Sequence, residues 1–219
     1  MSFPEAEKLL IVEPWGGFRA RVRLLVREEG ERRQRLCVQG FLGRNGVTSS
    51  KREGDGCTPA GVFSLDLAFG TAENPGARLP YKKLAPADYW VDDPTSPFYN
   101  QFVTWTAPKK PWDSAEHLIE EQAAYRYAAN ICCNPERVPV RGSAVFLHCS
   151  TGGPTAGCVS VPEPVMAALL RELDGESRIW IRDAQKSRVK AEKTKIFFQK
   201  ASSGFGDVSF KERSGRFKA

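Results

Sequence analysis

A cysteine and a histidine, two residue types that together support nucleophilic catalysis, lie ten positions apart at Cys158 and His148. A thiol attacks a carbonyl carbon as its thiolate, so it needs a nearby base or a positive electrostatic environment. The apolar run 143–147 predicts a buried strand that ends at His148, and residues 150–154, rich in Gly and Pro, can turn the chain back toward it. The spacing alone leaves two interpretations equally open: an activated thiol with its base, or a small buried cysteine beside a structural histidine.

The residues after Cys158 predict a helix that begins close to the thiol. Ser160 and Glu163 have the spacing of a capping box, and Pro162 suits a first helical turn. The apolar stripe of this helix consists of Val165, Met166, Leu169, Leu170 and Leu173. A helix start here would direct N–H groups and the positive dipole end toward the thiol. With Gly157 beside it, the backbone amides near Cys158 are candidates for an oxyanion hole.

Short strands dominate the rest of the predicted architecture. Residues 19–26 alternate basic and apolar side chains with a period of two, the pattern of a half-buried strand. Further elements are expected as strands at 8–12, 36–38, 62–65, 125–131 and 178–181 and as a short helix at 112–121. Since no βαβ alternation repeats, we expect a mainly-β domain, a sandwich or partly closed barrel, with one well-specified helix after Cys158. This domain is expected over residues 1–184, followed by a C-terminal extension over 185–219.

The excess positive charge of the chain is concentrated in that extension. The net charge is +6, but residues 185–219 contain ten Lys or Arg and three Asp or Glu, a net of +7, so the first 184 residues sum to −1. Such an extension can contact an anionic polymer or membrane surface, or simply remain solvated. Because the charge is not spread over the surface of the domain, no specific nucleic-acid partner is predicted.

Metal, cofactor and disulfide chemistry find little support in the composition. Six cysteines in 219 residues are too sparse for a disulfide scaffold, and none forms a CxxC pair. The chain has only two histidines, His117 and His148. We therefore expect no metal site and no cofactor.

Several motifs in a fixed order resemble one family. Residues 146–148 (Phe-Leu-His) followed by 155–161 (Thr-Ala-Gly-Cys-Val-Ser-Val) look like the signature of the YkuD-type L,D-transpeptidase domain. Upstream, residues 51–56 with 58–63 (Thr-Pro-Ala-Gly-Val-Phe) are similar to the family's Lys…Thr-Pro-x-Gly-x-Phe segment. Segments that resemble a less-studied branch of the family lie at 90–94, 98–100 and 114–116. The resemblance extends over residues 36–182.

This resemblance implies a mostly-β fold and acyl transfer from a peptide bond that follows a D-centre in peptidoglycan stem peptides. Cys158 would be acylated, His148 would take and return the proton, and Gly157 would complete the catalytic signature. An amine acceptor would then give a cross-link, whereas water would give carboxypeptidase activity. Ala156 and Ser160 stand where better-known members have a histidine and an arginine, so the substrate contacts and the reaction outcome stay open.

Other polar residues are candidates for substrate contacts. The set consists of Lys51, Arg52, Asp92, Asp93, Glu116, Thr155 and Ser160. The two cations suit a carboxylate and the acidic residues suit the ammonium group of a diamino acid, while exposed turns and solvated loops are the alternatives. Cys149 follows the histidine and alternates to the other side of the strand, so a structural role is expected for it.

The leading functional hypothesis is an L,D-transpeptidase-like cysteine acyltransferase acting on peptidoglycan or muropeptides. The sequence contains no signal-peptide core and no apolar run of transmembrane length, so we expect the cytoplasm, or the cell envelope if a leader was removed. This favours, as an alternative, an L,D-carboxypeptidase or amidase that trims muropeptides inside the cell. A hypothesis of another class is a non-catalytic cell-wall-binding module that kept only the fold.

Overall fold

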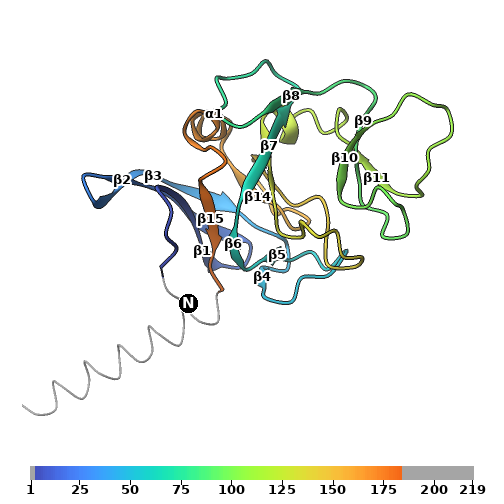
Figure 1. Ribbon diagram of the computed structural model, residues 1–219. Coiled ribbons are helices and arrows are strands. Elements are labelled where there is room, and N and C mark those ends of the chain that lie inside the picture. The colour runs from blue at the N-terminus through green and yellow to red at the C-terminus, as the bar shows by residue number, and fades with distance from the viewer. Residues whose placement is uncertain (1–2, 184–219) are drawn as a thin grey trace, which may run out of the picture. The chain divides into compact units, whose positions relative to one another are not determined.

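The computed structural model describes residues 3–183, so the basic extension predicted at 185–219 lies outside the described residues. Three sheets are formed within them (Figure 1): one of ten strands in the order β6-β15-β1-β2-β3-β14-β13-β12-β7-β8, one of three in the order β10-β9-β11, and the pair β4-β5. The strands are β1 (Lys8–Gly16), β2 (Arg19–Glu28), β3 (Glu31–Phe41), β4 (Val47–Thr48), β5 (Thr58–Pro59), β6 (Gly61–Phe63), β7 (Leu65–Gly70), β8 (Tyr81–Lys83), β9 (Asp88–Val91), β10 (Gln101–Thr104), β11 (Ala115–His117), β12 (Ala128–Ile131), β13 (Phe146–Cys149), β14 (Val159–Val161) and β15 (Arg178–Ile181). The helical elements are the 3₁₀ turn η1 (Ala124–Arg126) and the helix α1 (Glu163–Glu172).

The mainly-β class predicted from the sequence is confirmed, with α1 as the one α-helix of the described residues. The order of the large sheet runs from β6 at one edge to β8 at the other, so these strands do not close into a barrel. The strands of the described residues thus form several sheets and no closed barrel, which is consistent with the predicted L,D-transpeptidase type of fold.

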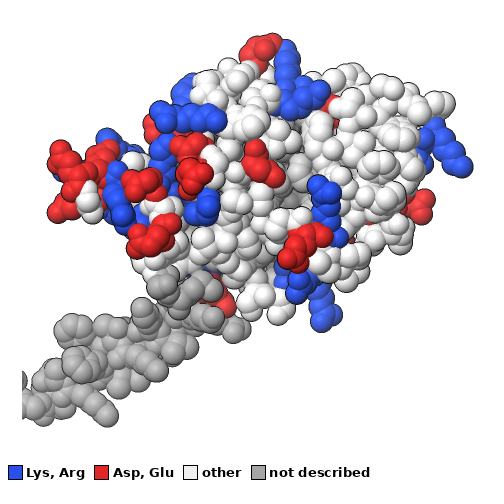
Figure 2. All heavy atoms as spheres, viewed as in Figure 1, with Lys and Arg blue, Asp and Glu red and all other residues white. Residues whose placement is uncertain are grey.

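The first three strands form an antiparallel meander that follows the period-two pattern of the sequence. In β2, Ala20, Val22 and Leu24 are buried between more exposed arginines. Glu29 and Gly30 make the β2–β3 turn with φ values of 52° and 84°, the type I′ geometry that matches the twist of paired strands. On this hairpin, basic and acidic side chains lie next to each other (Figure 2), which agrees with the small net charge of the first 184 residues.

The strands that carry the motif residues lie inside the large sheet. β13 is parallel to β14 on one side and antiparallel to β12 on the other. Its side chains alternate, so Leu147 and Cys149 belong to the main core, where α1 also packs, whereas Phe146 belongs to a second core on the opposite face. Since His148 lies two residues after Phe146, it shares this second face.

The three-stranded sheet is attached to the second core by Trp90. This residue of β9 is 4% exposed, and its ring centroid lies 4.9 Å from that of Phe146 and 6.4 Å from that of Phe69. A separate aromatic cluster of the same small sheet contains Tyr89, Phe98, Trp105 and Trp112. The small sheet therefore packs directly behind β13.

Three local predictions differ from the structure. The helix expected at 112–121 is absent: residues 115–117 form β11, because they pair with β9. The strand expected at 125–131 begins at Ala128, because the 3₁₀ turn η1 precedes it. The helix after Cys158 begins at Glu163 with Pro162 as its N-cap and no side-chain cap, since residues 159–161 form β14 instead. At β11 and β14, pairing with remote strands overrides the local pattern.

Candidate active site

Cys158 and His148 lie on one face of the large sheet. In the parallel register of β13 and β14, His148 is opposite Ser160 and Leu147 is opposite Val159. Cys158, one residue before β14, is therefore level with Phe146, whose N–H donates a hydrogen bond to Sγ at 3.2 Å. Because residues two apart on a strand face the same side, the Cys158 and His148 side chains are diagonal neighbours. Both are buried, and both line one pocket.

The Cys158 thiol is neutral in this environment. Burial, and then the nearby charge of Glu116, raises its pKa well above the usual range. Its S–H group donates to the carbonyl oxygen of Ala144 at 3.4 Å. The expected helix start beside the thiol is wrong, because β14 separates Cys158 from α1 at Glu163. Of the two means of activation that the sequence offered, the positive helix end is excluded and the neighbouring base remains.

His148 is held in the form that can act as that base. Burial lowers the pKa of its imidazole, so the ring is neutral. Its Nδ1 lies 2.9 Å from the carbonyl oxygen of Cys149, a contact that requires Nδ1–H as the donor. The other nitrogen, Nε2, then carries the lone pair. The ring of Tyr125 packs edge-to-face against the imidazole at 5.7 Å and restricts its orientation.

The loop before Cys158 is fixed by two threonine hydroxyls. Thr155 Oγ1 accepts from the N–H of Gly157 at 3.2 Å and donates to the carbonyl oxygen of Cys158 at 2.7 Å. Thr58 Oγ1 donates to the same oxygen at 3.2 Å. A Cβ at position 157 would lie 3.0 Å from the carbonyl oxygen of Cys57, so only glycine fits without a shift. The Thr-Pro motif at Thr58 and the Thr-Ala-Gly-Cys motif at 155–158 are thus in direct contact with each other.

The pocket that contains Cys158 and His148 has a volume of about 530 Å³ and a predominantly acidic lining. Its Lys, Asp and Glu residues are Lys51, Glu53, Asp92, Glu116, Glu120 and Glu121. Burial raises the pKa of the Glu116 carboxyl to about 7, against the lowering effect of a hydrogen bond from the Tyr125 hydroxyl. Asp92 accepts from Ser114 Oγ at 2.5 Å. The pocket therefore suits a ligand that carries a positive charge.

Two of the predicted contact residues do not reach this pocket. Asp93 accepts hydrogen bonds from Thr95 and from the Asp113 N–H, so it orders the loops after β9 and β10. Arg52 lines a neighbouring pocket that also includes Lys51. Thr155 lines the acidic pocket, but its hydroxyl is used within the loop.

Ser160, the residue in place of the family arginine, is 1% exposed and directly opposite His148. Its hydroxyl has no hydrogen-bond partner among residues 3–183. An arginine here would have to extend out of β14 into the pocket, whereas serine leaves that space to a ligand.

Sequence reasoning missed three residues that support the site. Tyr125 was hidden in the strand predicted over 125–131. Glu53 belongs to the upstream motif and accepts hydrogen bonds from the hydroxyls of Tyr99 at 2.5 Å and Ser143 at 3.0 Å. Asn100, at a left-handed φ of 53°, accepts from the Ala144 N–H at 3.2 Å and so positions the carbonyl that holds the thiol. Glu53 and Asn100 lie inside motifs that resemble the family, and this was the sequence feature that could have identified them as site residues.

No cluster of His, Cys, Asp and Glu side chains among the described residues could hold a metal ion. In the same part of the chain, no helix is both long enough and apolar enough to span a bilayer.

Fold and pocket together describe a mainly-β domain with a buried cysteine and a neutral histidine on one sheet face. The family model of the L,D-transpeptidase catalytic domain (YkuD) matches residues 19–196, which is 178 of the 219 residues. The chain therefore belongs to this family.

Among solved structures, one of Bd1075 from Bdellovibrio bacteriovorus is similar, with 13% sequence identity and a TM-score of 0.44. The match covers 89% of this chain and 56% of that chain, so this protein spans little more than half the length of its structural relative. No curated protein matches the sequence.

Proposed function

We propose that this protein is a cysteine acyltransferase of the L,D-transpeptidase type acting on peptidoglycan stem peptides, with Cys158 as nucleophile and His148 as general base. The observation that carries the proposal is that both side chains share one sheet face and one pocket, with Nε2 of the neutral imidazole as the free lone pair. Membership of the L,D-transpeptidase catalytic domain family supports the reaction class.

The first half-reaction forms a thioester. Nε2 of His148 takes the Cys158 proton as Sγ attacks the carbonyl carbon of the substrate peptide bond. The negative charge that develops on the carbonyl oxygen is stabilised by the backbone N–H of Cys158, since the Gly157 N–H already donates to Thr155 Oγ1. The C–N bond then breaks, and His148 returns the proton to the departing amine. In the second half-reaction an amine or a water molecule attacks the thioester and releases Cys158.

The acidic lining of the pocket supports a substrate with an ammonium group. Glu116 and Asp92 are the carboxylates suited to receive it, because both line the pocket of Cys158 and neither has a cationic partner among the described residues. Burial and, after it, this negative charge keep the thiol neutral at rest by raising its pKa. A bound ammonium group offsets the negative charge and makes the thiolate easier to form. Activation of Cys158 is thereby coupled to substrate binding.

Product analysis with a disaccharide tetrapeptide, in the presence and absence of an amine acceptor, tests the proposal. We expect released D-amino acid in both reactions and a cross-linked product only with the acceptor. Cys158→Ala should abolish both products. Cys149→Ala is the matched control, since this thiol is buried on the opposite side of β13 in the main core. Wild-type turnover by Cys158→Ala would refute the proposed nucleophile.

The same experiment separates the alternatives. Release of D-amino acid without any cross-link would identify an L,D-carboxypeptidase that uses the same thioester. An absence of both products, together with unchanged binding of peptidoglycan by Cys158→Ala, would identify a non-catalytic wall-binding module.

A further inference from the structure

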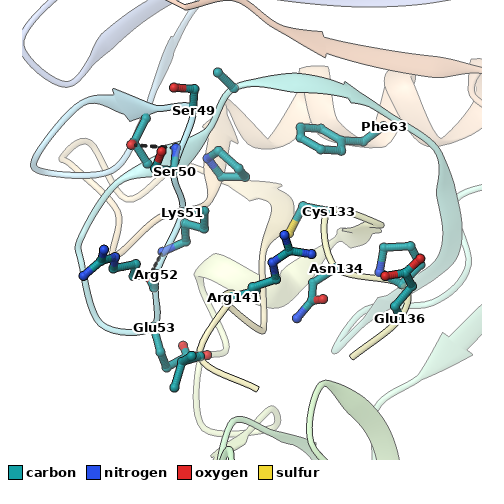
Figure 3. Close-up of a pocket in the computed structure, with 15 residues that line it drawn as sticks. Ser49, Ser50, Lys51, Arg52, Glu53, Phe63, Cys133, Asn134, Glu136 and Arg141 are labelled. Carbon is teal, nitrogen blue, oxygen red and sulfur yellow. Dashed lines mark hydrogen bonds between the residues drawn. The ribbon is translucent and has the colours of Figure 1, made fainter. Parts of the chain in front are cut away.

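A second, larger pocket adjoins the acidic one. It has a volume of about 890 Å³ and is lined by residues 48–53, 59–60, 63, 133–136 and 140–141 (Figure 3). Lys51 and Glu53 line both pockets, so the two cavities meet at these residues. A ligand that reaches Cys158 can therefore extend into the second pocket over the Lys51–Glu53 boundary.

The second pocket differs from the first in charge. Its charged side chains are Lys51, Arg52, Glu53, Glu136 and Arg141. Lys51 Nζ forms an ion pair with Asp55 Oδ1 at 2.5 Å. The side chains of Arg52 and Arg141 make no hydrogen bond or ion pair within residues 3–183. In Figure 3 the Arg141 guanidinium extends between Lys51 and Cys133, whereas the Arg52 side chain points away from them. Arg141 is therefore the cation in this pocket that is available to a ligand.

The backbone at the rim of this pocket is strained. Val140 has a φ of 64°, a left-handed conformation that is costly for a β-branched residue, and its side chain is 61% exposed. Hydrogen bonds on either side maintain this conformation. The side-chain amide of Asn134 donates to the carbonyl oxygens of Val138 and Gly142, both at 3.0 Å. The Glu53 N–H donates to the carbonyl oxygen of Val140 at 3.0 Å. Strain of this kind collects at ligand-binding segments, where the surrounding structure maintains it.

The same segment leads directly into the active site. After Arg141 the chain continues to Ala144, whose carbonyl oxygen accepts from the Cys158 thiol, and then enters β13 with His148. Contacts made at Arg141 thus lie on the chain segment that positions the nucleophile.

We infer that the second pocket is a carboxylate subsite for the extended stem peptide, with Arg141 as its anchoring cation. The inference rests on the proposed function. An extended peptide places its scissile carbonyl at Cys158, its ammonium group against the acidic lining, and a free carboxylate farther along the chain against Arg141. Guanidinium groups bind carboxylates through two parallel N–H···O bonds, which gives this subsite directional selectivity. The two pockets then recognise opposite charges of one substrate.

The test compares two peptides that differ by one group: a stem tetrapeptide with a free α-carboxylate at its D-isoglutamyl residue, and the same peptide with that group amidated. Binding is measured by calorimetry on full-length Cys158→Ala, so turnover is not required. We expect the free carboxylate to bind about tenfold more tightly, and Arg141→Gln in the same background to remove this preference by weakening the carboxylate peptide alone. Arg137→Gln is the matched control, since Arg137 lies in the same segment but lines a different pocket.

Three outcomes would overturn the inference: equal binding of both peptides, a carboxylate preference that persists in Arg141→Gln, or loss of the preference in Arg137→Gln as well. In the third case the effect would be that of general positive charge. None of these results depends on Cys158 chemistry. A protein that binds both peptides as expected and forms no thioester would refute the proposed function and leave the carboxylate subsite intact.

Discussion

The protonation state of the Cys158 thiol depends on residues from other segments of the chain. Burial and then the charge of Glu116 raise the pKa of the thiol, and backbone groups of Ala144 and Phe146 hydrogen-bond to the sulfur. A neutral resting thiol protects the cysteine from adventitious alkylation and oxidation, which both require thiolate. Under the proposed function, this thiol would become reactive when substrate is bound.

The first residue-level prediction concerns this acidic field. Glu116→Gln keeps an oxygen that accepts from the Tyr125 hydroxyl but removes the negative charge. The pKa of Cys158 should fall, so its alkylation by iodoacetamide at pH 8 should become several-fold faster. Mass spectrometry of Cys158 over a time course measures the rate.

Glu120→Gln is the control for the alkylation experiment. Glu120 lines the same pocket, but its side chain is 72% exposed, so solvent screens its charge and the alkylation rate should not change. Equal rates for Glu116→Gln and the wild type would show that Glu116 does not control the thiol.

The second residue-level prediction is a pH dependence. The pKa of Glu116 is raised to about 7, so the carboxyl is neutral below this pH and charged above it. Affinity for a peptide with a free ammonium group should therefore rise as pH increases from 6 to 8. Binding of the N-acetylated peptide should not show this step. The titration is measured by calorimetry on Cys158→Ala, and Glu116→Gln should flatten it; a step that survives in this variant would assign it to another group.

At the scale of the element, the loop before β14 explains why two distant motifs occur together. Thr58 of β5 and Thr155 of the loop both bind the Cys158 carbonyl oxygen, and Gly157 passes within contact of Cys57. The position of Cys158 above the sheet therefore depends on these two threonine hydroxyls and on the close backbone approach at Gly157.

Gly157→Ala tests this close approach. The added methyl group would lie 3.0 Å from the Cys57 carbonyl oxygen, which forces the loop and Cys158 to move. We expect a loss of about 1–2 kcal/mol in the free energy of unfolding and a fall in activity of about a hundredfold. Gly153→Ala is the matched control, because nothing lies within 4 Å of its Cβ position. Similar activity of the two variants would contradict the proposed constraint.

At the scale of the whole domain, the active site lies where the two sheets meet. Trp90 brings the three-stranded sheet against Phe146, and β9 of the same sheet pairs with β11, which carries Glu116. The acidic residue Glu116 thus comes from the small sheet, whereas Cys158 directly precedes β14 of the large one. Stability and site geometry are linked through the contacts of Trp90 with Phe146 and Phe69.

Trp90→Ala measures the strength of that link. Removing a side chain that is 4% exposed should lower the free energy of unfolding by about 3–5 kcal/mol. Trp15→Ala, at a position 60% exposed on β1, should cost less than about 0.5 kcal/mol. Urea denaturation followed by circular dichroism gives both values. A cost below about 1 kcal/mol for Trp90→Ala would show that the sheets hold together without it.

The local sequence pattern was sufficient to predict the long strand β2 and the short inner strand β15 of the large sheet. β15 has the predicted bounds, Arg178–Ile181, and β2 continues the predicted alternation from Arg19. It failed for β11 and β14, each three residues long, because so few residues carry no periodicity of their own and are strands only through pairing with β9 and β13. The start of α1 moved for the same reason.

The sequence by itself determined the mainly-β class. Its motifs, in their fixed order, indicated the family, and the pairing of one cysteine with one histidine followed as a hypothesis. Only the tertiary structure decided that Cys158 and His148 share a face, because this follows from the parallel register of two strands. It also decided the tautomer of His148, the neutral state of the thiol and the acidic lining of the pocket that contains them. These properties are set by distances between remote segments, and a linear pattern of residues does not contain those distances.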